Sequence, residues 1–142
     1  MKVKELMTDH VIDIGQEEPV SAAARTLTHY NIGVVPVRGR GGALCGMLTD
    51  REIVTRCLAA GRMPENTRVR EIMTPKVYSV TPDMDASLAA HMMGRLQIRR
   101  LPVIDNGKLC GMLSLGDLAG QEESAYDAAD AFGEITSGIS HR

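Results

Sequence analysis

The chain has 142 residues, of which 44% are hydrophobic and 24% are charged, the usual mix of a soluble globular domain. This composition excludes a wholly disordered chain. No stretch approaches the roughly 18 uncharged apolar residues of a membrane-spanning helix, and the N-terminus lacks the apolar segment of a secretory signal. We therefore expect a cytoplasmic protein without a membrane span.

Charge and aromatic content argue against a nucleic-acid partner. The net charge is −2, but residues 120–142 alone carry −4, so the rest of the chain carries +2. That is far from the basic excess of nucleic-acid-binding proteins. Only four residues are aromatic, which leaves few side chains that could stack on bases.

The cysteines and histidines lack the spacing of a metal site. Cys45, Cys57 and Cys110 form no C-x-x-C pair, and the four histidines show no H-x-x-x-H or H-E-x-x-H pattern. We therefore expect reduced thiols and no metal site. We interpret Cys45 and Cys110 as small buried residues, and the sequence does not decide whether they approach each other.

The chain contains an internal repeat. Residues 3–37 match residues 69–103 at an offset of 66 with eleven identical positions, where chance gives about two. The hairpin loop that follows is one residue shorter in the second copy, and residues 44–48 then return without a mismatch at 109–113. The sequence therefore predicts two copies of one unit.

The first copy is predicted to contain three strands and two helices. A first helix with apolar positions at helical spacing separates the first two strands, and a glycine-rich loop separates the last two. We expect strands at 11–14, 34–37 and 43–48, helices at 19–31 and 49–61, and the loop at 39–42. The apolar stripe of the first helix consists of Val20, Ala23, Ala24, Leu27 and Tyr30.

The second copy follows the same order and ends in an acidic tail. We expect strands at 77–80, 101–104 and 108–113, a helix at 85–96, a hairpin turn at 105–108 and a last helix from about Asp117. Leu88, Ala89, Met92, Met93 and Leu96 form the helix's apolar stripe. The tail is predicted to be helical over 120–135, with Tyr126, Ala129 and Phe132 as a narrow apolar stripe, and disordered from 136.

These elements predict an α/β (α+β) fold of two β-α-β-β-α repeats packed about a pseudo-twofold axis. A unit of about 65 residues buries only about 60% of its surface alone, so pairing of the two copies is expected to cover more of it. The predicted divisions are 1–65, 66–120 and the acidic tail 121–142. Because proline lacks an N–H group, Pro36 and Pro102 predict that their strands begin at a sheet edge or a bulge.

The motifs of both copies resemble the cystathionine-β-synthase (CBS) domain, and the tandem resembles a Bateman module. Copy 1 carries Met7-Thr8 with Val11, Ile32–Val37 and Gly46–Glu52, and copy 2 carries Met73-Thr74 with Val77, Ile98–Val103 and Gly111–Asp117. The resemblance covers residues 3–119. It implies a regulatory sensor that binds an adenosine-containing ligand in the clefts between the copies, forms a disc-like homodimer and regulates an unidentified protein in trans.

The sequence favours a sensor over an enzyme and a nucleotide over other adenosyl ligands. No nucleophile–base pair or metal cluster is visible, so we expect neither catalysis nor a catalytic cofactor. Arginines near the expected site favour the phosphates of AMP, ADP or ATP over S-adenosylmethionine, and we place NADH behind the mononucleotides. Mg²⁺ is expected only with ATP.

Copy 2 carries the main expected site. A carboxylate at Asp117, three residues after Ser114 at a helix start, can accept hydrogen bonds from both ribose hydroxyls. Arg99 and Arg100 are expected to meet phosphate, but strand alternation predicts that they lie on opposite faces, so that one of them reaches it. By resemblance, the remaining site residues are Thr74, Val77, Tyr78, Leu101 and Pro102.

Copy 1 carries a weaker expected site at Thr8, Val11, Val35, Pro36, Thr49 and Glu52. Here Glu52 replaces the aspartate, and Thr49-x-x-Glu52 fits a capping box, which satisfies the first helical N–H groups without a ligand. We interpret Arg56 as a solvated charge. The alternative function is therefore a structural or protein-interaction module whose clefts are filled by side chains.

Overall fold

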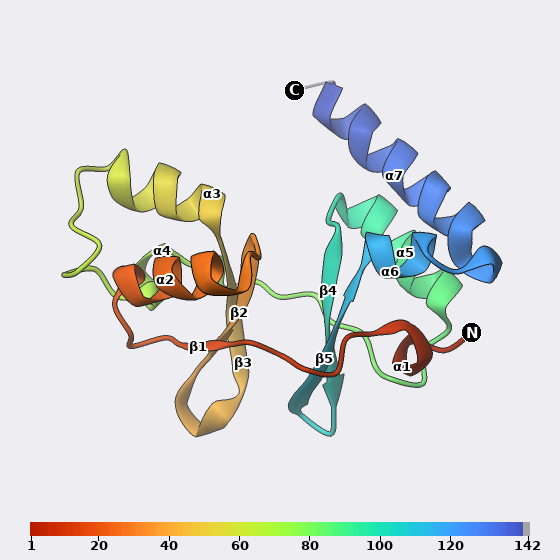
Figure 1. Cartoon of the computed structure of the whole chain (residues 1–142), viewed down its shortest axis with the longest axis horizontal. Coiled ribbons are helices and arrows are strands. Elements are labelled where there is room, and N and C mark those ends of the chain that lie inside the picture. Colours follow the sequence, from red (N-terminus) through yellow and green to blue (C-terminus); the bar gives the residue numbers. More distant parts are fainter. Residues whose placement is uncertain (141–142) are drawn as a thin grey trace. The chain divides into compact units, whose positions relative to one another are not determined.

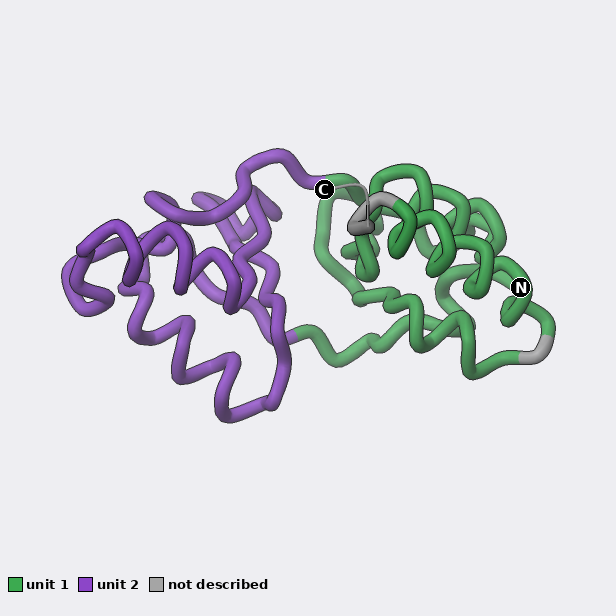
Figure 2. The backbone as a smooth tube through the Cα atoms, turned by 90° about the horizontal axis from the view of Figure 1, so that it is seen from above, with its two compact units in different colours: residues 1–11, 78–142 green, residues 12–77 purple. Residues whose placement is uncertain are grey.

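The computed structural model describes residues 1–140, with side chains except at Glu122 and residues 138–140 (Figure 1). The chain divides into two compact units (Figure 2). Unit 1 combines Met1–Val11 with Tyr78–Arg142, and unit 2 is Ile12–Val77. The units therefore do not coincide with the predicted divisions, because the first eleven residues leave copy 1 and pack with copy 2.

Unit 2 is built on a three-stranded sheet in the order β1-β2-β3. β1 pairs parallel with β2, and β2 pairs antiparallel with β3. The elements are β1 (Ile14–Gly15), α2 (Val20–Tyr30), β2 (Val34–Arg38), η1 (Arg40–Gly42), β3 (Leu44–Thr49), α3 (Asp50–Glu52), the π-helix η2 (Ile53–Leu58) and α4 (Val69–Ile72). Val20, Ala23 and Leu27 of α2 join a core that the sheet and α4 share, which confirms most of the predicted apolar stripe.

Unit 1 is built on the antiparallel hairpin of β4 and β5. The elements are α1 (Val3–Leu6), α5 (Ala86–Leu96), β4 (Arg100–Asp105), β5 (Lys108–Ser114), α6 (Leu115–Ala119), η3 (Glu122–Ser124) and α7 (Ala125–Ser140). Asn106 and Gly107 have φ angles of 51° and 79°, which confirms the predicted tight turn. The strand predicted at 77–80 is reduced to one bridge between Val80 and Val103.

Each Met-Thr motif packs on the hairpin of the other copy. In unit 2, Thr74 and Met47 exchange two backbone hydrogen bonds of 2.9 and 3.0 Å. In unit 1, Thr8 and Met112 exchange equivalent bonds of 2.8 and 2.9 Å. The short helices before these motifs, α4 and α1, therefore complete the core of the copy to which they do not belong in sequence.

The packing of each Met-Thr motif on the other copy explains why a glycine begins each Gly-Met-Leu run. A Cβ atom at Gly46 would lie 2.6 Å from the Met73 sulfur, and one at Gly111 would lie 2.5 Å from the Met7 sulfur. Both positions are closer than real Cβ atoms approach. The two motifs therefore depend on each other: the methionine of one occupies the space that a side chain at the glycine of the other would need.

Pro36 lies in β2, the middle strand of its sheet, but at a position where β2 has no strand partner on the β1 side, so the predicted edge position holds locally. Met47, which faces Pro36 in the register, uses both its backbone groups for Thr74. On the other side, β1 pairs only with Val37 and Arg38. No pairing in the sheet therefore requires an N–H group from Pro36. The irregularity in the register falls one residue later, between Val37 and Arg38.

The C-terminal helix α7 packs along α5 and α6 of unit 1 (Figure 1). Its buried face consists of Ala128, Ala131 and Ile135, each 2% exposed. Tyr126 is 86% exposed, so the stripe predicted through Tyr126, Ala129 and Phe132 is wrong. Small residues allow the helices to approach closely: a Cβ atom on Gly94 of α5 would lie 3.1 Å from the Ala131 Cα. The helix also continues to Ser140, where disorder was predicted; residues 141–142 lie outside the described residues.

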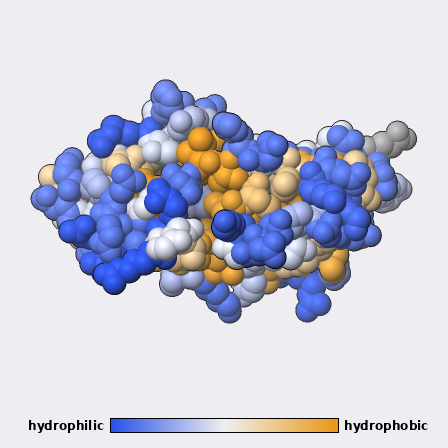
Figure 3. Space-filling view, turned by 90° about the horizontal axis from the view of Figure 1, so that it is seen from below, coloured by the Kyte–Doolittle hydropathy of each residue, from blue (hydrophilic) through white to orange (hydrophobic). Residues whose placement is uncertain are grey.

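Hydrophobic side chains also reach the surface among hydrophilic ones, as one face of the molecule shows (Figure 3). Tyr30 and Leu88 are both 50% exposed, although they were predicted to lie in the apolar stripes of α2 and α5. The other exposed large residues are Val54, Leu58, Met63, Tyr78, Tyr126 and Phe132. Within residues 1–140, no helix is long and apolar enough to cross a membrane.

Candidate functional sites in the two units

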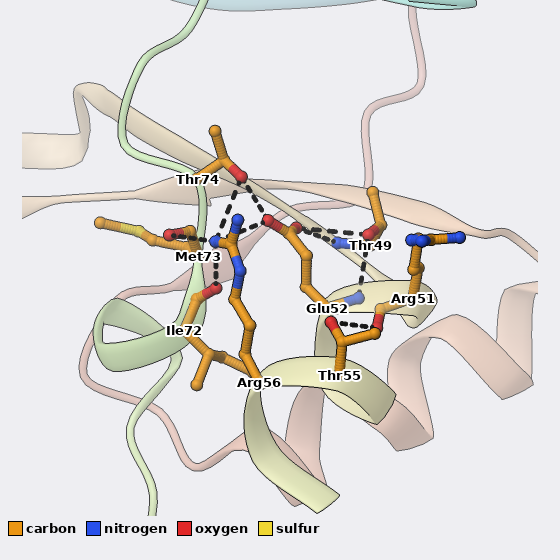
Figure 4. Close-up of polar contacts among 8 residues, drawn as sticks. All are labelled: Thr49, Arg51, Glu52, Thr55, Arg56, Ile72, Met73 and Thr74. Atoms are coloured by element: carbon orange, nitrogen blue, oxygen red, sulfur yellow. Dashed lines mark hydrogen bonds and ion pairs between the residues drawn. The ribbon is translucent and has the colours of Figure 1, made fainter. Parts of the chain in front are cut away.

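The carboxylate of Glu52 in unit 2 is buried and engaged at both oxygens (Figure 4). Oε1 accepts a hydrogen bond of 2.9 Å from the Thr49 N–H and one of 3.3 Å from the Thr49 hydroxyl. Oε2 accepts a hydrogen bond from the Thr74 hydroxyl and pairs with the Arg56 guanidinium at 3.0 Å. Both carboxylate oxygens of Glu52 therefore have hydrogen-bond or ion-pair partners within the protein.

Arg56 ties this carboxylate to the segment that follows α4. Its Nη1 donates to the Ile72 carbonyl at 3.1 Å and to the Met73 carbonyl at 3.4 Å (Figure 4). Arg56 is half-exposed, as its interpretation as a solvated charge implies, but that interpretation missed its ion pair with Glu52. Its spacing four residues after Glu52 on a helix was the signal that could have predicted the pair. We call Thr49, Glu52, Arg56 and Thr74 the Glu52 clasp.

The equivalent carboxylate of unit 1, Asp117, makes fewer contacts. Its Oδ2 accepts from the Ser114 N–H at 2.8 Å, and the Asp117 N–H donates to the Ser114 hydroxyl at 3.0 Å. This arrangement is a complete capping box. Gln121 occupies the sequence position equivalent to Arg56. Among the described residues, Asp117 Oδ1 has no hydrogen-bond or ion-pair partner.

Next to this capping box, unit 1 contains a hollow of about 520 Å³, within the size range of small-molecule sites. Its rim is basic, and its wall on the α7 side is apolar. The lining residues are Arg99, Arg100, Ser114, Leu115, Gly116, Ala119, Ala125, Ala128, Ala129 and Phe132. None of these ten residues is acidic, so the hollow suits an anion.

Both arginines line the hollow, so the prediction that they lie on opposite faces is wrong. Arg99 precedes the first residue of β4, and strand alternation therefore does not apply to the pair. The Arg99 guanidinium carbon lies 5.6 Å from the centre of the Phe132 ring. Within the described residues, neither Arg99 nor Arg100 pairs with a carboxylate. The matching residues of copy 1, Gly33 and Val34, are uncharged.

The Met-Thr motifs lie with different partners from those predicted. Thr74, grouped with the Ser114 site, is bonded to Glu52 in unit 2, and Val77 also belongs to unit 2. Thr8, grouped with the Glu52 site, pairs with Met112 in unit 1. The exchange of the short helices between the copies explains both corrections.

The remaining predicted site residues are mostly core residues. Leu101 and Val35 are 0% exposed, and the prolines that follow them are also buried. Val11 is partly buried at the end of the first segment of unit 1, and Tyr78 is 39% exposed. Three of the nine residues predicted for the main site, Arg99, Arg100 and Ser114, thus line the hollow. Sequence reasoning did not include Phe132 or the alanines of α7.

The sequence matches the CBS domain over residues 3–59 and 69–134. The chain belongs to the CBS domain family. CBS domain-containing protein YhcV of Bacillus subtilis (strain 168) is 38% identical over 134 residues, which is 94% of each chain. The structure therefore consists of two CBS repeats in an α+β fold, and CBS pairs of this kind are regulatory modules.

Two solved CBS structures are similar to this chain. Hypoxic Response Protein I, with two coordinated zinc ions, has a TM-score of 0.78 and 32% identity over 85% of this chain and 98% of its own. The CBS pair of protein MJ0100, in complex with 5′-methylthioadenosine and S-adenosyl-L-methionine, has a TM-score of 0.75 and 25% identity, covering 84% and 94%. Among the described residues of this CBS pair, no group of three or more histidines, cysteines or acids could hold a metal ion.

Proposed function

We propose that this CBS pair is a sensor that binds one adenine nucleotide per chain through unit 1. The observation that carries the proposal is the difference between the two carboxylates. Both oxygens of Glu52 are engaged within unit 2, whereas Asp117 keeps one oxygen without a partner among the described residues. Two arginines without carboxylate partners there line the adjacent hollow.

Each of these groups suits one part of a nucleotide. Arg99 and Arg100 suit the phosphates, because hydrogen bonds between guanidinium and phosphate are charge-assisted. Ser114 and Asp117 suit the ribose hydroxyls. AMP, ADP or ATP therefore ranks above S-adenosylmethionine and NADH, with Mg²⁺ only alongside ATP. The adenosyl ligands of the MJ0100 CBS pair support an adenosine-containing ligand.

The binding is proposed to regulate a separate protein and not to support catalysis. The described residues show no cluster suited to a metal ion, and the relatives are CBS-domain proteins. A ligand can regulate only if it favours one conformation over another. We propose that the chain forms a homodimer and that its regulated partner is a different polypeptide.

A second candidate function has support from unit 2. The Glu52 clasp fills that copy's expected site with side chains, as a structural or protein-interaction module would. If unit 1 also bound no ligand, this function would apply to the whole chain.

Calorimetric titration with ATP, ADP, AMP and adenosine tests the proposal. We expect the nucleotides to bind more tightly than adenosine, and Arg99→Ala and Arg100→Ala each to weaken AMP about tenfold or more, as loss of a charged hydrogen bond does. Asp117→Asn should weaken AMP and adenosine alike. Arg95→Ala is the matched control, since Arg95 is an exposed arginine of α5 outside the lining of the hollow. No binding of any of the four compounds would favour the interaction module.

A further inference from the structure

Helix α7 contributes an apolar wall to the hollow that Arg99, Arg100 and Ser114 also line. Ala125, Ala128 and Ala129 contribute small side chains, and Phe132 contributes a ring. The tail that carries them has no counterpart in copy 1. The wall is therefore a feature of unit 1 only.

Phe132 is the aromatic residue among those that line the hollow. Arg99 lies over its ring, yet the residue is still 48% exposed. A half-exposed phenylalanine beside a cation presents an apolar planar surface and a positive charge side by side. A molecule that combines a planar ring with an anionic group matches both features.

We infer that Phe132 and the alanines of α7 form the wall against which the base of the bound nucleotide lies. This inference rests on the proposed function, which sets the phosphate at Arg99 and Arg100. A base attached to that phosphate through a ribose can then reach the ring of Phe132, because both arginines and the ring border the same hollow. Stacking on an aromatic ring is a common way to hold a base.

The family resemblance implies a different position for the base, in which backbone groups near Val77–Tyr78 and Leu101–Pro102 frame the adenine. Leu101 is 0% exposed, and Pro102 is buried. The Pro102 carbonyl also accepts a hydrogen bond of 3.0 Å from the Val80 N–H. Phe132 is more exposed than Tyr78, Leu101 and Pro102. A base that lies against Phe132 would make helix α7 a determinant of ligand specificity.

The test compares AMP with ribose 5-phosphate, which carries the sugar and phosphate without the base. The proteins are the full-length wild type, Phe132→Leu, Tyr78→Leu and the control Tyr126→Leu. Phe132→Leu keeps an apolar side chain but removes the ring. Tyr126 is on the same helix, is 86% exposed and does not line the hollow. Thermal unfolding of each variant checks that the fold is retained.

We expect Phe132→Leu to weaken AMP at least about fivefold, the lower end for loss of one stacked base. Its affinity for ribose 5-phosphate should not change, and Tyr126→Leu should bind both ligands as the wild type does. Equal weakening of both ligands by Phe132→Leu would overturn the inference, since the ring would then act only through Arg99.

Two other outcomes would also overturn it, and they separate it from the proposed function. Selective loss of AMP in Tyr78→Leu but not in Phe132→Leu would place the base at Tyr78 and leave the proposed function standing. A wild type that binds neither AMP nor ribose 5-phosphate would overturn the proposed function together with the inference.

Discussion

Units 1 and 2 are built from the same repeated sequence, but their equivalent carboxylates have different surroundings. Both begin a helix with a capping box, Thr49 with Glu52 and Ser114 with Asp117. Glu52 is longer by one methylene group and reaches Thr74 and Arg56 as well. Among the described residues, the Asp117 carboxylate forms a hydrogen bond with Ser114 only. One additional methylene group and the Arg56 cation thus accompany the larger set of polar partners around Glu52.

The helices that follow the two capping boxes also differ between the units. In unit 2 it continues as the π-helix η2 to Leu58 and carries Arg56 toward Ile72. In unit 1 the helix ends at Ala119, and the chain begins again as α7 at Ala125. The hollow lies beside this interruption, with α6 and α7 both contributing to its lining. The comparison teaches that residues outside the shared motif, Arg56 in unit 2 and helix α7 in unit 1, determine the surroundings of the two capping boxes.

Removing the two carboxylates should have unequal effects on stability. Glu52→Ala should lower the free energy of unfolding by about 2 to 3 kcal/mol, because it removes a helix cap and leaves Arg56 and Thr74 without their acceptor. Asp117→Ala removes only the cap and should cost about 1 kcal/mol. Urea denaturation monitored by circular dichroism measures both losses.

The conservative variant Glu52→Gln serves as the control for this pair. It keeps an oxygen that can accept the Thr49 N–H but has no charge for Arg56, so its loss of stability should fall between those of the wild type and Glu52→Ala. Equal losses for Glu52→Ala and Asp117→Ala would contradict the difference we draw between the two units.

Replacement of Gly46 or Gly111 by alanine should have similar effects on stability, because the Met-Thr motifs pack in the same way in both units. Gly46→Ala and Gly111→Ala should each lower the free energy of unfolding by roughly 1 to 2 kcal/mol, as overpacking does. A new Cβ atom would meet the sulfur of Met73 or Met7 and, at 3.0 Å, a threonine carbonyl oxygen.

Gly107→Ala is a useful comparison for this pair, because its φ is 79° and nothing lies near a Cβ atom there. Its loss would arise from backbone strain and not from crowding. Replacing Met73 by alanine in the Gly46→Ala background should recover part of the stability lost to crowding. If it recovers none, the methionine contact does not explain the glycine.

The smallest expected effect concerns the equivalent cysteines. Burial raises the pKa of the Cys45 thiol, and burial together with the charge of Asp105 raises the pKa of the Cys110 thiol. Since the thiolate is the reactive form, both should react with iodoacetamide severalfold more slowly at pH 8 than cysteine in an unfolded peptide. Mass spectrometry after timed labelling measures the rates. Labelling of either native cysteine as fast as in guanidinium chloride would contradict this prediction.

Sequence reasoning was most successful where neighbouring residues decide the structure. Helix α2 lies between the predicted signals, with Pro19 at its N-cap and Asn31 in the left-handed conformation at its C-cap. The tight turn at Asn106-Gly107 and the capping box at Thr49 were found for the same reason. Each of these features depends on contacts within about four residues.

Sequence reasoning failed where a distant segment decides. Arg99 and Arg100 were predicted to lie on opposite faces because side chains alternate along a strand. The strand begins only at Arg100, so the rule does not apply to Arg99. The wrong face of α7 was expected to be buried, because the larger side chains Tyr126 and Phe132 suggested an apolar stripe. Close approach to Gly94 on α5 instead favours the alanine face.

The sequence by itself determined that the chain has two similar α+β copies of the CBS domain, and it indicated the capping residues and the copy with arginines beside its carboxylate site. These are properties of spacing and local chemistry. The tertiary structure alone decided that each Met-Thr motif packs on the other copy, that Arg56 completes the Glu52 clasp, and that α7 forms a wall of the hollow in unit 1. Such contacts join residues far apart in the chain, and their formation depends on which surfaces fit together in three dimensions.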